Sequence, residues 1–116
     1  GTELPALFTN NDSLGDKIIN EGIKQIDPMW RLPLFRPYNA QLDKNNNALS
    51  STGSSGTGGA ITAALFLNRF INKHTNWAHI DLMAWNTSSR PGFPMGGEAM
   101  GLRSIVNMIM KYCSKR

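Results

Sequence analysis

The apolar residues of this chain recur with spacings that predict short strands and amphipathic helices. The first group, residues 4–8, is followed by Thr9, Asn10 and Asn11, a pattern typical of a short buried strand that ends in a turn. A helix follows, because Asn11 or Asp12 can cap its first turn and apolar residues then recur at helical spacing. We expect Asp16 and Glu21 to face solvent, opposite an apolar side made of Leu14, Ile18, Ile19, Ile23 and Ile26.

The middle of the chain predicts a long irregular stretch, a second helix and a second strand. Asp27-Pro28 ends the first helix, because proline disfavours helical geometry in the residue before it. Residues 29–57 are poorly periodic, and their Asn-rich and Gly-rich parts are typical of surface loops. Residues 60–72 predict a helix buried on more than one side. Residues 77–85 are almost continuously apolar, which predicts a strand covered on both faces at the centre of the sheet.

The last third of the chain completes the fold prediction. Residues 86–97 are rich in Pro and Gly and predict a loop, and residues 98–112 predict a final helix. This order of elements, with no internal repeat, predicts an α/β fold in which helices cover a mixed β-sheet in three layers. The apolar side of the last helix comprises Leu102, Ile105, Val106, Ile109 and Met110, and we expect Trp30, Trp77 and Trp85 in the core.

Length and charge change this picture in one respect. The 116 residues fit one domain or part of one. Charged residues are only 17% of the chain, against about 25% in an average soluble domain, so more of the surface is expected to be covered. Together with a first residue, Gly1, that is not Met, this suggests a fragment or a processed chain, or a subunit of an oligomer.

Compartment and membrane association follow from cysteine usage and apolar run lengths. The single cysteine, Cys113, excludes an internal disulfide framework, and we expect it to be a structural apolar residue. No charged and apolar leader opens the chain, and its longest apolar run is far short of the ~18 residues that span a bilayer. We therefore expect a cytoplasmic protein with no membrane partner.

Two segments could bind a small ligand. Residues 53–59 are Gly-rich and precede a helix, where a phosphate could bind, but neither nucleotide fingerprint is complete, which favours a loop that lets the helix pack closely. His79 and Asp81 alternate on one face of a strand and could chelate a metal, with Glu98 as a distant third ligand. The alternative that we favour for these two is a buried hydrogen-bonded pair.

Two further activities find little support in the residues. The chain has no Gly-x-Ser-x-Gly elbow, which argues against a serine hydrolase. The basic C-terminus could suit a nucleic acid, but cations at a helix end are explained by the helix dipole, so we expect no nucleic-acid partner. The basic residues concerned are Arg103, Lys111, Lys115 and Arg116.

Three blocks of sequence together resemble one family. They are residues 30–34 (Trp-Arg-Leu-Pro-Leu), residues 59–67 (Gly-Ala-Ile-Thr-Ala-Ala-Leu-Phe-Leu) and residues 77–81 (Trp-Ala-His-Ile-Asp). In order and approximate spacing they closely resemble the C-terminal part of the leucyl (cytosol) aminopeptidase family, over about residues 6–112. The Ala-Trp-Asn of residues 84–86, with residues 90–92 and 96–99 after it, resembles a bacterial branch of that family.

The resemblance implies a two-metal exopeptidase that releases N-terminal residues from peptides and assembles as a hexamer. Two divalent ions, Mn or Zn, would hold the substrate and activate a water molecule. The family's acidic Asn-Thr-Asp-Ala-Glu-Gly-Arg signature does not occur here. By resemblance, residues 1–116 form the C-terminal portion of the catalytic domain, with no catalytic residue and no metal ligand, and the chain alone is expected to be inactive.

Three positions correspond to pocket residues of the family. Met83 and Asn86 fall where relatives line the pocket for the first substrate side chain, and Thr52 falls where they line the next pocket. The alternative for each is a residue that only packs a loop. For the whole chain, the alternative is a non-catalytic binding or assembly module that retains the aminopeptidase fold.

Overall fold

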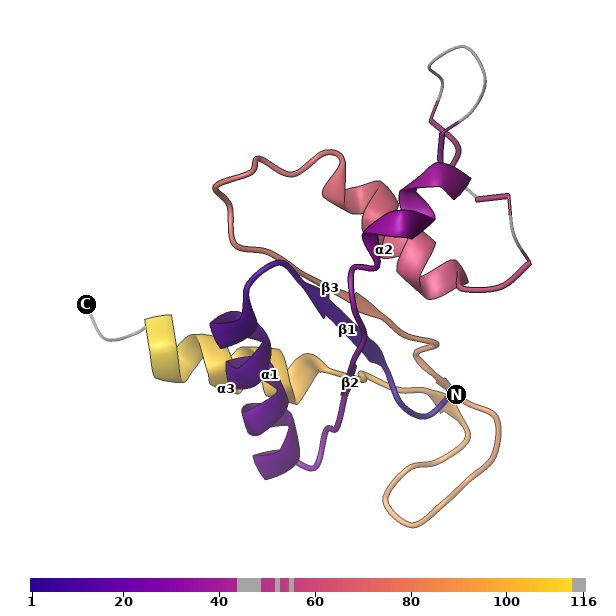
Figure 1. The fold of residues 1–116 in the computed structure, drawn as a ribbon. Coiled ribbons are helices and arrows are strands. Elements are labelled where there is room, and N and C mark those ends of the chain that lie inside the picture. Colours follow the sequence, from indigo (N-terminus) through magenta and orange to yellow (C-terminus); the bar gives the residue numbers. More distant parts are fainter. Residues whose placement is uncertain (44–48, 52, 55, 114–116) are drawn as a thin grey trace.

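The computed structural model of this chain describes residues 1–43, 49–51, 53–54 and 56–113. It is an α/β fold with a small mixed sheet and helices beside it, as the sequence predicts (Figure 1). The elements in chain order are β1 (Ala6–Thr9), α1 (Asp12–Lys24), β2 (Trp30–Arg31), the 3-10 helix η1 (Arg36–Gln41), α2 (Gly59–Asn68), β3 (Ala78–Asp81), β4 (Trp85–Asn86), β5 (Gly96–Gly97) and α3 (Leu102–Cys113).

The main sheet has the order β2-β1-β3, with β1 parallel to β2 and antiparallel to β3. Leu7 pairs with Ile80, and Phe8 pairs with His79. In the described part of the chain β3 lies at the edge, so the prediction that residues 77–85 form the centre is wrong. The centre is β1, because Leu7 and Phe8 are both completely buried and point to opposite faces of the sheet.

Helices lie on both sides of this sheet, as the three-layer prediction requires. Leu7 packs against Ile18 of α1, Met29 and Met108 of α3 on one face. Helix α2 contacts β1 and β3 and lies on the side away from α1 and α3 (Figure 1). The fully buried Leu65 belongs to α2. The core is therefore split by the sheet into two thin layers.

The first helix begins as predicted, but its buried side is different. The Asn11 side chain accepts a hydrogen bond from the backbone N–H of Leu14 at 2.8 Å, which caps α1. Ile23 and Ile26 are 67% and 76% exposed, whereas Glu21 is buried. The expectation that Glu21 faces solvent is wrong because Lys111 of α3 lies beside it, 2.7 Å from Oε1, and balances its charge.

The last helix also differs from its predicted apolar side. It begins at Leu102 rather than at residue 98. The preceding residue, Gly101, has a φ of 78°, a left-handed backbone conformation that glycine adopts without strain. Its buried residues are Ser104 and Met108, and of the predicted apolar set only Ile105 packs on the core. The other four are exposed, namely Leu102, Val106, Ile109 and Met110.

Other departures from the predictions concern short elements and single residues. Helix α2 ends at Asn68, and isolated turns continue the chain to Ile71. The predicted loop at residues 86–97 contains the β4–β5 pair, and η1 was not predicted. Trp30 and Trp85 are more than half exposed, Trp77 is half-buried and Cys113 is exposed, so the core prediction for Trp30, Trp85 and Cys113 is wrong.

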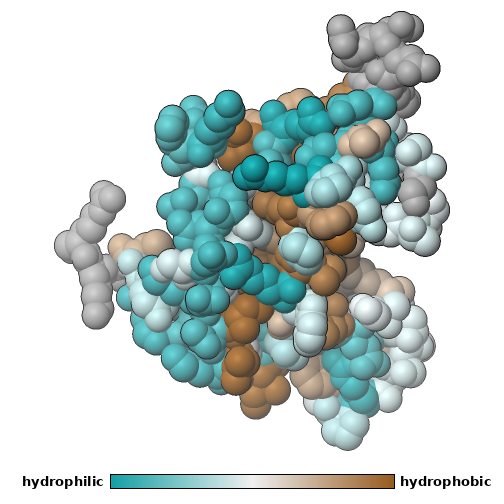
Figure 2. Space-filling model, viewed as in Figure 1, coloured by the Kyte–Doolittle hydropathy of each residue, from teal (hydrophilic) through white to brown (hydrophobic). Residues whose placement is uncertain are grey.

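The surface is larger than that of a compact monomer of this mass and carries many exposed large apolar side chains. The accessible area is 7874 Å², whereas a compact chain of this mass exposes about 6,300 Å². The radius of gyration is 15.9 Å, against about 13 Å for a compact domain of this length. Figure 2 shows apolar surface running between the polar regions of one face. The area and the radius of gyration both exceed the values of a compact chain of this size.

Candidate functional site

Met83 and Asn86, two of the predicted pocket residues, lie on either side of a sharp bend in the chain. Ala84, between Met83 and Asn86, has a φ of 55°, a left-handed value that turns the chain from β3 toward β4. The carbonyl oxygen of Ala84 accepts a hydrogen bond from the N–H of Glu98 at 3.0 Å, which holds the bend against the segment after β5. Thr52, the third predicted pocket residue, lies outside the described residues.

Met83 borders a small hollow at the end of β3. Its side chain is 46% exposed. The hollow measures about 300 Å³ and lies between residues 1–5 and the segment that follows β3, with Leu4, Pro5, Asp81 and Leu82 among its lining residues. Met83 therefore borders a surface hollow, and its place in a substrate pocket stays a prediction.

Asn86 is almost completely buried and contacts its own hairpin. Its Nδ2 donates a hydrogen bond to the carbonyl oxygen of Pro94 at 3.1 Å. Its Oδ1 is buried and has no hydrogen-bond partner among the described residues. An unpartnered buried acceptor costs roughly 1–3 kcal/mol, so this oxygen would gain from a donor brought by a ligand or by another chain.

His79 and Asp81 do not form the hydrogen-bonded pair that we favoured. The His79 ring stacks on Phe8 at 6.0 Å between ring centroids, and its Nε2 is buried with no partner among the described residues. Asp81 pairs with Ala6 in the sheet and lines the hollow beside Met83. Within the described residues no group of three His, Cys, Asp or Glu side chains could hold a metal ion. These residues therefore do not fit a two-metal centre.

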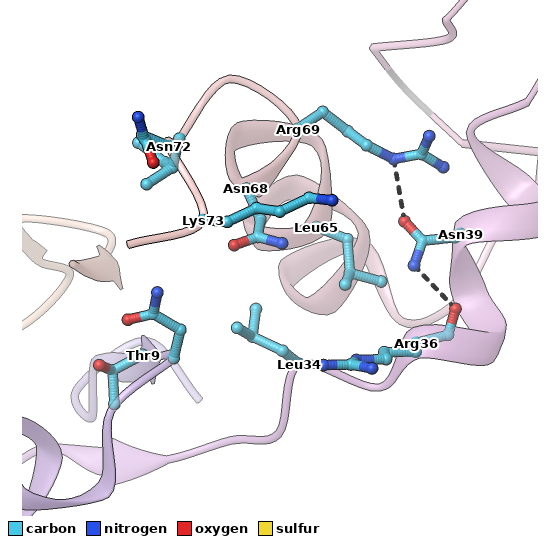
Figure 3. Close-up of a pocket in the computed structure, with 11 residues that line it drawn as sticks. Thr9, Leu34, Arg36, Asn39, Leu65, Asn68, Arg69, Asn72 and Lys73 are labelled. Atoms are coloured by element: carbon cyan, nitrogen blue, oxygen red, sulfur yellow. Dashed lines mark hydrogen bonds between the residues drawn. The ribbon is translucent and has the colours of Figure 1, made fainter. Parts of the chain in front are cut away.

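A second, larger hollow lies at the opposite end of the sheet from Met83. It measures about 800 Å³ and is lined by residues of η1 and of the C-terminal end of α2, which Asn39 and Arg69 join by a hydrogen bond (Figure 3). Leu34, Leu65 and Ile71 give it an apolar part. Polar residues complete its lining: Thr9, Asn10, Arg36, Asn39, Asn68, Arg69, Asn72 and Lys73. We call it the η1–α2 groove.

Sequence reasoning missed this groove because its lining comes from three separate segments, residues 9–10, 34–39 and 65–73. None of these segments matches a known ligand motif. The one local signal is the density of Asn, Arg and Lys in residues 68–73 after an apolar helix. Only the return of β3 beside β1 places those residues opposite Leu34 and Arg36.

A charge cluster around the buried Glu21 carboxylate joins α1 to α3, away from both hollows. Hydrogen bonds from the Lys111 and Lys24 ammonium groups hold the pKa of Glu21 below its ordinary value of 4.5. The same carboxylate raises the pKa of Lys111 above its ordinary value of 10.5. Lys111 also lies 5.2 Å from the ring centroid of Tyr112. This cluster ties the two helices together.

No helix among the described residues is long and apolar enough to cross a membrane.

Comparisons with known proteins identify the family. A family model described as the catalytic domain of the cytosol aminopeptidase family matches residues 1–106. A probable cytosol aminopeptidase of Chlorobium phaeobacteroides is 34% identical over 113 residues, covering 97% of this chain and 22% of that protein. One of Methylobacillus flagellatus is 40% identical over 94 residues, covering 79% of this chain and 18% of that protein.

Solved structures agree in fold. The cytosol aminopeptidase of Coxiella burnetii has a TM-score of 0.91 and 46% identity, and it covers 97% of this chain and 24% of its own. The bottromycin maturation enzyme BotP, solved in complex with Mn, has a TM-score of 0.88 and 28% identity, covering 94% of this chain and 24% of its own. The chain thus spans about a fifth to a quarter of the length of the proteins it matches. With a family model over residues 1–106 and relatives along nearly its whole length, this chain belongs to the cytosol aminopeptidase family.

Proposed function

We propose that this chain is part of a metal-dependent aminopeptidase that releases N-terminal amino acids from peptides. The observation that carries the proposal is the match of residues 1–106 to the family's catalytic domain, supported by 46% identity to the Coxiella burnetii enzyme. We assign residues 1–116 to the C-terminal portion of that domain, in a cytoplasmic enzyme that assembles as a hexamer.

The role of this segment is to supply sheet, helices and substrate-pocket walls. Met83 lines the hollow at the end of β3, and Asn86 carries a buried carbonyl oxygen without a partner among the described residues. Thr52 is assigned to the next pocket by resemblance. We assign the catalytic groups and the ligands of two divalent ions, Mn or Zn, to other segments of the enzyme, because the family's acidic signature does not occur in this sequence.

The proposal is tested by comparing this 116-residue chain with the protein encoded by the complete reading frame that contains it. Both are assayed for hydrolysis of leucine amide with added manganese or zinc, and both are titrated with each metal by calorimetry. We expect metal-stimulated turnover and two-site binding for the complete protein and neither for the 116-residue chain. Turnover by the short chain would contradict the assignment of the chemistry to other segments.

The exposed apolar surface favours a second candidate, a non-catalytic assembly module with the aminopeptidase fold. The same assay separates the two functions. A complete protein that folds and associates but neither binds paired metals nor hydrolyses leucine amide would favour the module.

A further inference from the structure

The η1–α2 groove and the hollow beside Met83 lie at opposite ends of the antiparallel β1–β3 pair. Thr9 and Asn10, at the end of β1, line the groove, whereas Asp81 and Met83, at the end of β3, line the other hollow. The groove is thus separate from the pocket residues that the proposed function uses, and its ligand does not depend on that proposal.

Hydrogen bonds within the groove use up most of its acceptor atoms. Asn39 Oδ1 accepts from Arg69 Nε at 3.2 Å, and Asn39 Nδ2 donates to the carbonyl oxygen of Arg36 at 2.9 Å. Asn68 Oδ1 accepts from the Trp77 indole N–H at 3.0 Å. Because an indole N–H can only donate, this bond fixes the amide of Asn68 and leaves its two Nδ2 hydrogens free to donate elsewhere.

The positive charges of the groove are only partly balanced. Arg69 is paired with Asp43, at 3.1 Å between Nη2 and Oδ1. Arg36 and Lys73 form no ion pair with any acidic side chain in the described part of the chain. Figure 3 shows Lys73, Asn68 and Leu65 on the α2 side, with Leu34 and Arg36 across the hollow. Two unbalanced cations and an amide donor therefore surround an apolar patch.

We propose that the η1–α2 groove binds a small organic carboxylate with an apolar body. Arg36 and Lys73 donate hydrogen bonds to the ligand's carboxylate, because charge-assisted hydrogen bonds from Arg and Lys to a carboxylate are among the stronger polar contacts. The Nδ2 of Asn68 supplies a further donor. Leu34, Leu65 and Ile71 contact the apolar body, which separates such a ligand from a bare inorganic anion.

The test uses N-acetyl-leucine as the probe, with three comparison compounds. Acetate has the carboxylate without the apolar body, N-acetyl-leucinamide has the apolar body without the charge, and inorganic phosphate is a different oxyanion. Binding to the 116-residue chain is followed by nitrogen-15 NMR, in which side-chain amide signals of Asn39 and Asn68 report directly on the groove. We expect saturable shifts of those signals with N-acetyl-leucine and weaker binding of all three comparison compounds.

Charge variants locate the contact. Arg36→Gln and Lys73→Gln are each expected to weaken N-acetyl-leucine binding about tenfold, as loss of a charge-assisted hydrogen bond does. Lys17→Gln is the matched control, because Lys17 lies on α1 beside Tyr112, away from the groove. The Lys17→Gln variant should bind N-acetyl-leucine with the same affinity as the parent chain.

Four results would overturn the proposal. They are equal weakening by Lys17→Gln, equal binding of N-acetyl-leucinamide, tighter binding of phosphate than of N-acetyl-leucine, and no saturable shift at roughly ten-millimolar probe. If a variant does not fold, the parent chain still decides the matter, since shifts confined to signals outside residues 34–39 and 65–73 would also exclude this groove.

Discussion

Asp27 caps helix α3 by accepting a hydrogen bond from the backbone N–H of Ser104, a residue 77 positions later in the sequence. Its carboxylate accepts hydrogen bonds from the backbone N–H of Ser104 at 3.0 Å and from that of Gly101 at 2.8 Å. The Ser104 hydroxyl lies 2.8 Å from the Asp27 carbonyl oxygen. Both side chains are buried. A carboxylate at a helix N-terminus satisfies free amides and opposes the positive end of the helix dipole.

Removing this cap should destabilise the fold more than ordinary surface substitutions do. We expect Asp27→Ala to lower the free energy of unfolding by about 2 kcal/mol or more, because the buried N–H groups of Gly101 and Ser104 lose their acceptor. Urea unfolding followed by circular dichroism measures the loss. Asp16→Ala is the control, since Asp16 is a largely exposed carboxylate on α1. Equal losses in the two variants would contradict the capping role.

Gly22 is the point where α1 approaches Asp27 and Ser104 most closely. A Cβ atom there would lie 2.8 Å from the Asp27 carbonyl oxygen and 3.1 Å from Ser104 Oγ. Gly22→Ala should therefore destabilise the chain by about 1–3 kcal/mol, despite the better helix propensity of alanine. Gly59→Ala, at the first residue of α2 with open space around it, should be neutral or stabilising. A melting temperature raised by Gly22→Ala would disprove the close contact.

Ile26, two residues after the end of α1, has the left-handed conformation, with a φ of 53° and 76% exposure. A β-branched residue is strained there, whereas glycine adopts this geometry freely. We expect Ile26→Gly to stabilise the chain by about 0.5–1 kcal/mol, by relief of strain. Ile23→Gly, within α1 and similarly exposed, should instead destabilise it by about 1 kcal/mol. The same sign of effect in both variants, measured by thermal unfolding, would refute the strain at residue 26.

The Glu21–Lys111 pair makes stability depend on pH at both extremes. Because the folded pKa of Glu21 is below 4.5, its contribution is present above that pH and is lost as the pH falls through the folded value. Because the pKa of Lys111 is raised above 10.5, its contribution is present below that pH and is lost at strongly alkaline pH. Glu21→Gln should reduce the pH dependence of the unfolding free energy at both the acidic and the alkaline end. Glu3→Gln, an exposed carboxylate, should leave it unchanged.

Self-association of the 116-residue chain is expected from the exposed side of α3. Leu102, Val106, Ile109 and Met110 are spaced to form one stripe and are each 43% exposed or more. Exposed apolar patches above a few hundred Å² mark interfaces in most soluble proteins. Sedimentation velocity should show concentration-dependent association that Ile109→Lys weakens and that Ser88→Lys, in an exposed loop, does not. A monodisperse monomer at high concentration would rule this out.

Asn86 is expected to influence the substrate preference of the complete enzyme. An amide left unpaired by an apolar substrate costs roughly 1–3 kcal/mol, so Asn86→Met should favour large apolar first residues by about tenfold to a hundredfold. Because the Asn86 amide also binds Pro94, thermal stability is measured alongside kcat/KM for several amino-acid amides. An unchanged substrate profile in a stable variant would show that Asn86 only packs its hairpin.

Local chemistry in the sequence was sufficient to predict the main helices and the first strand. The apolar run before Thr9, the Asn11 cap and the helix stop at Asp27-Pro28 each act over a few residues, and the structure has β1 and α1 at those places. The three sequence blocks likewise carried the family assignment, because motif order and spacing are properties of the chain itself.

Only the tertiary structure decided which side of each element is buried and which strand lies at the centre. Glu21 is buried because Lys111 arrives from 90 residues away, and Ile23 and Ile26 remain exposed although they continue the helical apolar pattern. β3 lies at the sheet edge because pairing depends on neighbours, which hydrophobicity alone does not specify. The η1–α2 groove exists because β3 returns beside β1 and brings Asn68 and Lys73 opposite Arg36, a long-range arrangement that no local spacing encodes.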